Sequence, residues 1–109
     1  MQKNCSISFF LQPFNGSGKK KLSIFDQRVT KHLRKIKYLD GSNQFDLTSL
    51  FYKEINQEFK ENEEFHDLSE VFDNYQGEVW FDHVHFSDIG ADIIAKKIIQ
   101  IHFDKNITR

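Results

Sequence analysis

The segment from Phe81 to Ala95 constrains this 109-residue chain most strongly, because it places Asp82 three residues before His85 at the start of an amphipathic helix. In one tight loop, a carboxylate at position i and an imidazole at i+3 can meet through the ring's Nδ1 proton. Nε2 of the ring is then free to accept a proton from a nucleophile. The spacing indicates the orienting acid and the general base of a catalytic triad, with Asp82 and His85 as candidate catalytic residues.

A helix is expected directly after this loop. Ser87 can cap it, Asp88 lies favourably in its first turn, and Asp92 precedes Lys96 by four residues, the spacing of an ion pair on one helix face. Its apolar stripe is formed by Ile94, Ile98 and Ile101. One face of this helix should pack and the other should face solvent.

Two more helices are expected upstream. Ser23 and Asp26 resemble a capping box at the start of a helix that runs to about Lys37, and a second helix should follow an Asp46 cap and run to about Lys60. The apolar residues at helical spacing are Phe25, Val29, Leu33 and Ile36 in the first, and Leu47, Phe51, Ile55 and Phe59 in the second.

Short apolar runs predict the strands. The apolar run from Ile7 to Leu11 is followed closely by Pro13, as suits the end of a buried parallel strand. Phe65 to Leu68 is a second candidate strand. A helical turn is expected over Ser69 to Asn74, and an extended segment, Glu78 to Phe81, leads to the Asp-x-x-His loop. Strands that alternate with helices predict an α/β fold, here about two short strands and three helices of a larger doubly wound sheet.

The run from residue 82 to 95, D-H-V-H-F-S-D-I-G-A-D-I-I-A, resembles the last block of the SGNH (GDSL-like) hydrolases. That block is Asp-x-x-His, a small or polar residue, Gly, and a helix containing Ala. Phe9 to Pro13 is similar to a late strand of the same fold, with a helix start at Leu22-Ser23. The resemblance spans about Ile7 to Ile99.

The resemblance implies a partial three-layer α/β/α, flavodoxin-like fold and ester or acyl hydrolysis. In that family a serine attacks the ester carbonyl, the residue matching His85 transfers the proton, and the residue matching Asp82 holds the imidazole. The substrates implied are acylated sugars, lipids and small esters, with no metal or organic cofactor.

The chain has no counterpart of the family's Gly-Asp-Ser block, nor of the Gly and Asn-containing blocks that build the oxyanion hole. We therefore expect residues 1–109 to be a single partial domain, the C-terminal portion of such a hydrolase, and to be inactive alone. It would be a truncated gene product, one piece of a split enzyme, or a chain cut at an artificial boundary. The alternative is a non-catalytic α/β module that binds a protein.

Charge and composition favour no particular macromolecular partner. Residues 19–37 carry eight basic residues and one acid, and residues 46–82 carry eleven acids and two bases. We interpret these as solvated helix faces and expect no nucleic-acid binding, because apart from Phe25 no aromatic residue interleaves with the basic run. Twelve Phe in so small a chain predict a Phe-rich core and, with strands missing, an exposed apolar patch that favours self-association.

Cysteine usage and hydropathy bear on disulfides, metal sites and the cellular compartment of the chain. Cys5, the single cysteine, excludes an internal disulfide and a paired-cysteine metal site. No stretch has the apolar length of a membrane span, and no signal peptide is recognisable, so a cytoplasmic protein is expected.

Other residues of the motif regions are interpreted structurally. His83 is expected to be a surface or loop-packing histidine, and a metal site of Asp82, His83 and His85 is disfavoured because no other histidine has a completing spacing. Residues 15–19 lack the phosphate-loop pattern and indicate a flexible loop, and Ser17 lacks the strained turn of a nucleophile. We expect Trp80 and Phe81 to pack beneath the site.

Overall fold

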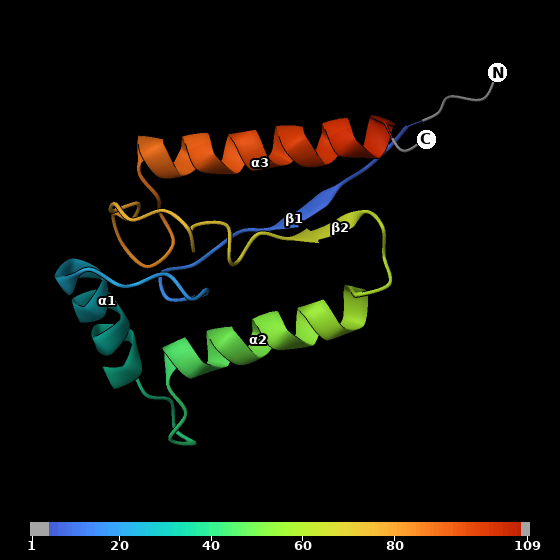
Figure 1. Ribbon diagram of the computed structural model, residues 1–109. Coiled ribbons are helices and arrows are strands. Elements are labelled where there is room, and N and C mark those ends of the chain that lie inside the picture. The colour runs from blue at the N-terminus through green and yellow to red at the C-terminus, as the bar shows by residue number, and fades with distance from the viewer. Residues whose placement is uncertain (1–4, 108–109) are drawn as a thin grey trace.

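The computed structural model describes residues 5–107 as a mixed α/β structure (Figure 1). Its elements in chain order are β1 (Phe9–Leu11), α1 (Ile24–Lys35), α2 (Gln44–Phe59), β2 (Phe65–Asp67) and α3 (Asp88–Ile107). The predicted α/β fold with about two short strands and three helices is confirmed. None of the described helices is both long and apolar enough to cross a membrane.

The two strands pair in parallel, with Phe9 opposite Phe65 and Leu11 opposite Asp67. Both strands are shorter than predicted, because Ile7 and Leu68 lie outside the paired segment. Leu68 nevertheless donates its N–H to the Leu11 carbonyl at 2.9 Å. Because the strands are parallel, the chain segments that follow them both leave the sheet at the edge formed by the carboxyl ends of the strands.

In Figure 1 the strand pair runs between α3 and α2. An apolar groove lies between the strands and α2, where the rings of Phe59 and Phe65 are 5.6 Å apart. On the other side, Phe10 lines a groove with Ile98 and Ile101 of α3. Phe10 also lines the groove toward α2, so the strand pair has an open groove toward each of the two helices.

α1 begins as predicted, since the Ser23 hydroxyl accepts the Asp26 N–H, but it ends at Lys35. The predicted apolar face is only partly correct: Phe25 is 43% exposed, and the buried residues are Asp26, Thr30 and Leu33. Internal hydrogen bonds allow two polar residues to face inward, because the Asp26 carboxylate accepts from a buried amide and the Thr30 hydroxyl donates to the Gln27 carbonyl.

The cap of α2 differs from the prediction. Asn43, not Asp46, caps the helix, because its side-chain oxygen accepts the Asp46 N–H at 2.8 Å. The predicted stripe is largely exposed, with Phe51 at 60%. Instead, Phe45 and Tyr52 turn inward and contact the Phe14 ring edge-on, with ring centroids 5.8 and 4.7 Å apart.

The described core lies beyond the strand ends rather than on the sheet. Phe72, Val79 and Trp80 form a buried cluster, against which Phe86 and residues of α3 pack. Trp80 therefore lies beneath the site as predicted, but Phe81 does not, since it is 68% exposed. Residues 69–74, the predicted helical turn, form successive turns.

α3 matches its prediction closely. The Ser87 hydroxyl accepts the Gly90 N–H at 3.3 Å, and Lys96 pairs with Asp92 at 2.8 Å. The predicted stripe is half-buried at all three of its positions, Ile94, Ile98 and Ile101. This helix extends from the loop that carries the candidate site.

Candidate active site

The segment from Val79 to Ser87 is a closed loop. Ser87 donates its N–H to the Val79 carbonyl at 2.7 Å, and Phe81 donates to the His85 carbonyl at 2.8 Å. Trp80 and Phe86 form an antiparallel bridge across the base. Residues 82–85, called the 82–85 turn below, therefore project from a base that is anchored in the core.

Asp82 organises this turn with both carboxylate oxygens. Oδ1 accepts the N–H groups of Val84 at 2.9 Å and His85 at 2.7 Å, and Oδ2 lies 2.8 Å from Nδ1 of His85. The predicted contact between the Asp82 and His85 side chains is confirmed. The two backbone N–H groups fix the Asp82 carboxylate in position, and the carboxylate in turn fixes the orientation of the His85 imidazole.

The same hydrogen bonds set the charge of the pair. The N–H groups of His85 and Val84, together with the His85 imidazole, hold the pKa of the Asp82 carboxyl well below its usual range. Asp82 is therefore ionised at neutral pH and can only accept. A neutral His85 must carry its hydrogen on Nδ1, so the Nε2 lone pair is available for a proton.

The pair is open to solvent, with side-chain exposures of 75% for His85 and 48% for Asp82. It lies beside the loop after β1, as predicted, because Asn15 donates its backbone N–H to the His83 carbonyl at 2.9 Å. Within residues 5–107, no Ser, Thr or Cys side chain hydrogen-bonds to His85. The structure thus brings together an acid and a base without showing their nucleophile.

No family model, curated protein or solved structure compared with this chain matches it.

Three residues that contact or support the 82–85 turn were not predicted as site residues: Gln12, Asn15 and Asp26. Residues 15–19 were expected to form a flexible loop, yet Asn15 is fully buried. Asp26, expected only at the start of a helix, is 1% exposed. The available signal was weak: an amide residue follows the predicted strand, at the edge where open α/β folds place their sites. Nothing in the spacing indicated that Asn15 pairs with Asp26.

Ser17 and His83 have positions consistent with structural roles. The Ser17 hydroxyl accepts the Phe14 N–H and donates to the Ser69 carbonyl at 2.6 Å, so its proton is already used. His83 is half-buried and, with Arg28 and Asp82 among others, lines an open hollow of about 310 Å³. No group of three or more His, Cys, Asp or Glu residues that could hold a metal ion occurs in the described part of the chain.

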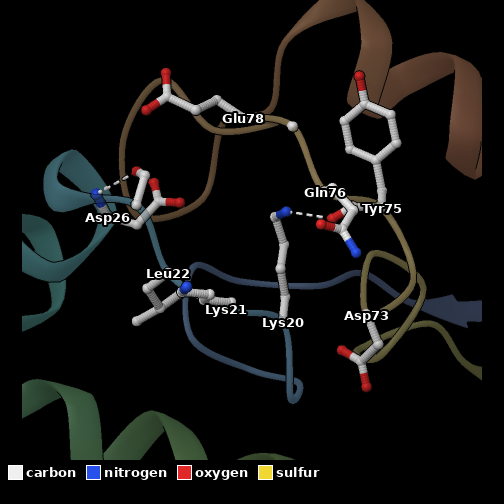
Figure 2. Close-up of a pocket in the computed structure, with 10 residues that line it drawn as sticks. Lys20, Lys21, Leu22, Asp26, Asp73, Tyr75, Gln76 and Glu78 are labelled. Carbon is white, nitrogen blue, oxygen red and sulfur yellow. Dashed lines mark hydrogen bonds between the residues drawn. The ribbon is translucent and has the colours of Figure 1, made fainter.

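A larger cavity, of about 390 Å³, lies elsewhere, between the segment before α1 and the 73–78 loop (Figure 2). The Lys20 side chain reaches across it, donates to the Tyr75 carbonyl and lies 5.5 Å from the centre of that ring. Neither Asp82 nor His85 lines this cavity. Lys20 therefore ties two loops together, at a distance along the chain from the candidate pair.

Proposed function

We propose that this chain supplies the acid–base half of an SGNH/GDSL-like esterase site, with His85 as general base and Asp82 as its orienting acid. The observation that carries the proposal is the Asp82–His85 contact of 2.8 Å on a turn that leaves the ring exposed. An ionised, backbone-anchored carboxylate behind an exposed imidazole is the arrangement that proton transfer in acyl chemistry needs.

In the proposed reaction, a serine from a polypeptide segment other than this chain attacks the carbonyl of an ester or acylated sugar. Nε2 of His85 takes the serine proton and returns it to the alkoxide as the carbon–oxygen bond breaks. Water then attacks the acyl-serine by the same route, with His85 again accepting and returning a proton. Asp82 remains ionised and stabilises the imidazolium in both steps.

The scaffold supports this proposal. Among residues 5–107, β1 pairs with β2 alone, so its other edge has room for a further strand. Grooves toward α2 and α3 flank the strands on both sides. A parallel sheet with helices on both faces is the partial three-layer, flavodoxin-like fold that we propose a second segment completes.

Complementation tests the proposal. The chain is mixed or co-expressed with a polypeptide that carries a Gly-Asp-Ser block, first of all one encoded next to Met1, and p-nitrophenyl acetate hydrolysis is followed. We expect activity that needs both parts and that a serine-directed inhibitor abolishes. The lone chain should not exceed the background of free imidazole.

The matched variants are His85→Ala and His83→Ala. Both remove an imidazole from the same turn, but of these two rings only that of His85 has a described hydrogen bond to the Asp82 carboxylate. Loss of the regained activity in His85→Ala and its retention in His83→Ala would support the proposed roles. Inhibitor-sensitive turnover by the lone chain would show instead that it contains its own nucleophile.

A non-catalytic protein-binding module is the second candidate, and the exposed apolar residues favour it. On α2, Leu50 and Phe51 are 51% and 60% exposed, and Phe9 of β1 is 56% exposed. Patches of this kind mark protein contacts. Such a module would bind a partner without gaining esterase activity, so the complementation assay separates the two functions.

A further inference from the structure

We infer that Asn15 and Asp26 are positioning residues that hold the 82–85 turn against the end of β1. The inference rests on the proposed function of Asp82 and His85, and it adds two residues that do not touch the reacting atoms. Neither residue belongs to the Asp-x-x-His motif, and both are at least 99% buried.

The contacts of the turn carry the inference. Three successive carbonyls of the turn accept hydrogen bonds from the segment after β1. The Asn15 N–H bonds to the His83 carbonyl at 2.9 Å, and the Asn15 side chain bonds to the Asp82 carbonyl at 3.4 Å. Gln12 reaches the Val84 carbonyl, also at 3.4 Å. Two N–H groups of the turn, those of Val84 and His85, bind the Asp82 carboxylate, whereas its first three carbonyls accept from the segment after β1.

The chemistry of the Asn15 amide is specific to this task. Its Nδ2 group donates to Asp26 Oδ1 at 3.0 Å as well as to the Asp82 carbonyl. Both partners are acceptors, so only the NH₂ end of the amide can face them. Within the described residues, Asn15 Oδ1 has no hydrogen-bond partner, although it is buried. The orientation of the Asn15 amide thus satisfies its NH₂ group and leaves its carbonyl oxygen without a hydrogen bond.

Asp26 fixes that orientation from α1. Its backbone N–H donates to the Ser23 hydroxyl at 3.1 Å at the helix start, a bond that the dashed line at Asp26 marks in Figure 2. This bond fixes the point on α1 from which the Asp26 carboxylate projects. The chain of contacts runs from the first turn of α1 through Asp26 and Asn15 to the carbonyl of Asp82. A shift of the Asn15 amide would therefore displace the turn that carries His85.

Two isosteric variants of the full chain test this role. Asn15→Asp keeps the volume but turns a double donor into an acceptor that faces two acceptors. Asp26→Asn keeps an oxygen that can accept from Asn15. The readout is NMR hydrogen exchange of the Val84 and His85 amides, with Leu33 in α1 as the reference. We expect exchange at the turn to rise about fivefold or more in Asn15→Asp, the factor that corresponds to about 1 kcal/mol of lost hydrogen bonding, and to change less than twofold in Asp26→Asn.

The double variant Asn15→Asp, Asp26→Asn separates positioning from simple packing. It restores a donor–acceptor pair between the two side chains with the donor on residue 26, but it leaves the Asp82 carbonyl without its amide donor. We expect the denaturation midpoint to recover toward wild type while exchange at Val84 and His85 stays fast. Wild-type exchange at the turn in the folded double variant, or in folded Asn15→Asp, would overturn the inference.

This experiment needs no activity, so its failure differs from failure of the proposed function. In the complemented enzyme, Asn15→Asp should lower kcat at least fivefold with little change in KM. Altered exchange at the turn without any regained esterase activity would uphold the positioning role and contradict the proposed function. Regained esterase activity with unchanged exchange at the turn would uphold the proposed function and contradict the positioning role.

Discussion

The Asp82 carboxylate makes all its described hydrogen bonds within four residues of chain, to Val84 and His85. Such a contact requires no distant element, because a carboxylate that accepts N–H groups two and three residues ahead closes a local turn. The turn also brings the His85 ring to the second carboxylate oxygen. The central geometry of the candidate site is therefore a property of a short sequence.

The lowered pKa of Asp82 makes a prediction about pH. Because the folded-state pKa lies below the unfolded value, near 3.9, Asp82 contributes stability above that value, and the contribution is lost as pH falls through the folded-state pKa. Asp82→Ala should be less stable than wild type at pH 7, and the difference should shrink progressively as the pH falls below about 4. Urea unfolding of both proteins at several pH values measures this. A constant difference from pH 7 down to pH 2 would contradict it.

Site residues whose contacts are close in sequence could be predicted, and those whose contacts are distant in sequence could not. Asp82 and His85 are three apart, so their spacing alone predicted the contact. Asn15 and Asp26 meet across eleven residues, through a loop and a helix start. A single buried amide and a single buried carboxylate leave no periodic pattern, and a polar residue is ordinarily expected at the surface.

At the scale of elements, α3 links the site to the core. Its first turn follows the 82–85 turn directly, and Gly90 lies where the helix approaches Phe86, Val79 and Phe72. A Cβ at Gly90 would lie 2.8 Å from the Phe86 Cβ and 3.2 Å from the Val79 carbonyl oxygen. Close packing at this point depends on the absence of a side chain at Gly90.

Gly90→Ala should therefore destabilise the protein, by about 1–3 kcal/mol, as overpacking of a close contact does. In an open helix the same change stabilises, by about 1 kcal/mol. Chemical denaturation gives the sign, and Gln57→Ala on exposed α2 is the control for helix propensity. A more stable Gly90→Ala protein would contradict the observed approach of α3 to the core.

The existence and order of the helices could be predicted, but two of their buried faces could not. Apolar periodicity points to the stripe that a complete core would cover, as in Leu47 and Phe51 of α2, both of which are exposed. On α1 the buried face includes Asp26 and Thr30, where Asp26 Oδ1 accepts from the Asn15 amide and the Thr30 hydroxyl donates to the Gln27 carbonyl. Periodicity detects apolar side chains and is blind to such bonds.

At the scale of the whole molecule, the strands are incompletely covered. The groove beside β1 has a volume of about 360 Å³ and is almost entirely apolar. It is lined mainly by Phe9, Phe10, Leu11, Ile55, Phe59 and Phe65. An unpaired strand edge beside an open apolar groove favours association.

The isolated chain should accordingly self-associate as its concentration rises, and sedimentation velocity measures this. Phe9→Lys places a charge in the groove and should weaken association. Leu39→Lys is the control, because Leu39 is fully exposed and lies outside the groove. A chain that stays monomeric at all concentrations, or an equal effect of both variants, would contradict this role for the groove.

The claim that Asp82 and His85 act as one catalytic unit is tested most directly by a double-mutant cycle in the complemented enzyme. The measurement is kcat/KM for wild type, Asp82→Asn, His85→Ala and the double variant. Each single change should cost on the order of 10³-fold or more, and the double variant should be no worse than His85→Ala alone, because Asp82 acts through the imidazole. Losses that multiply, or a wild-type rate in His85→Ala, would contradict the account.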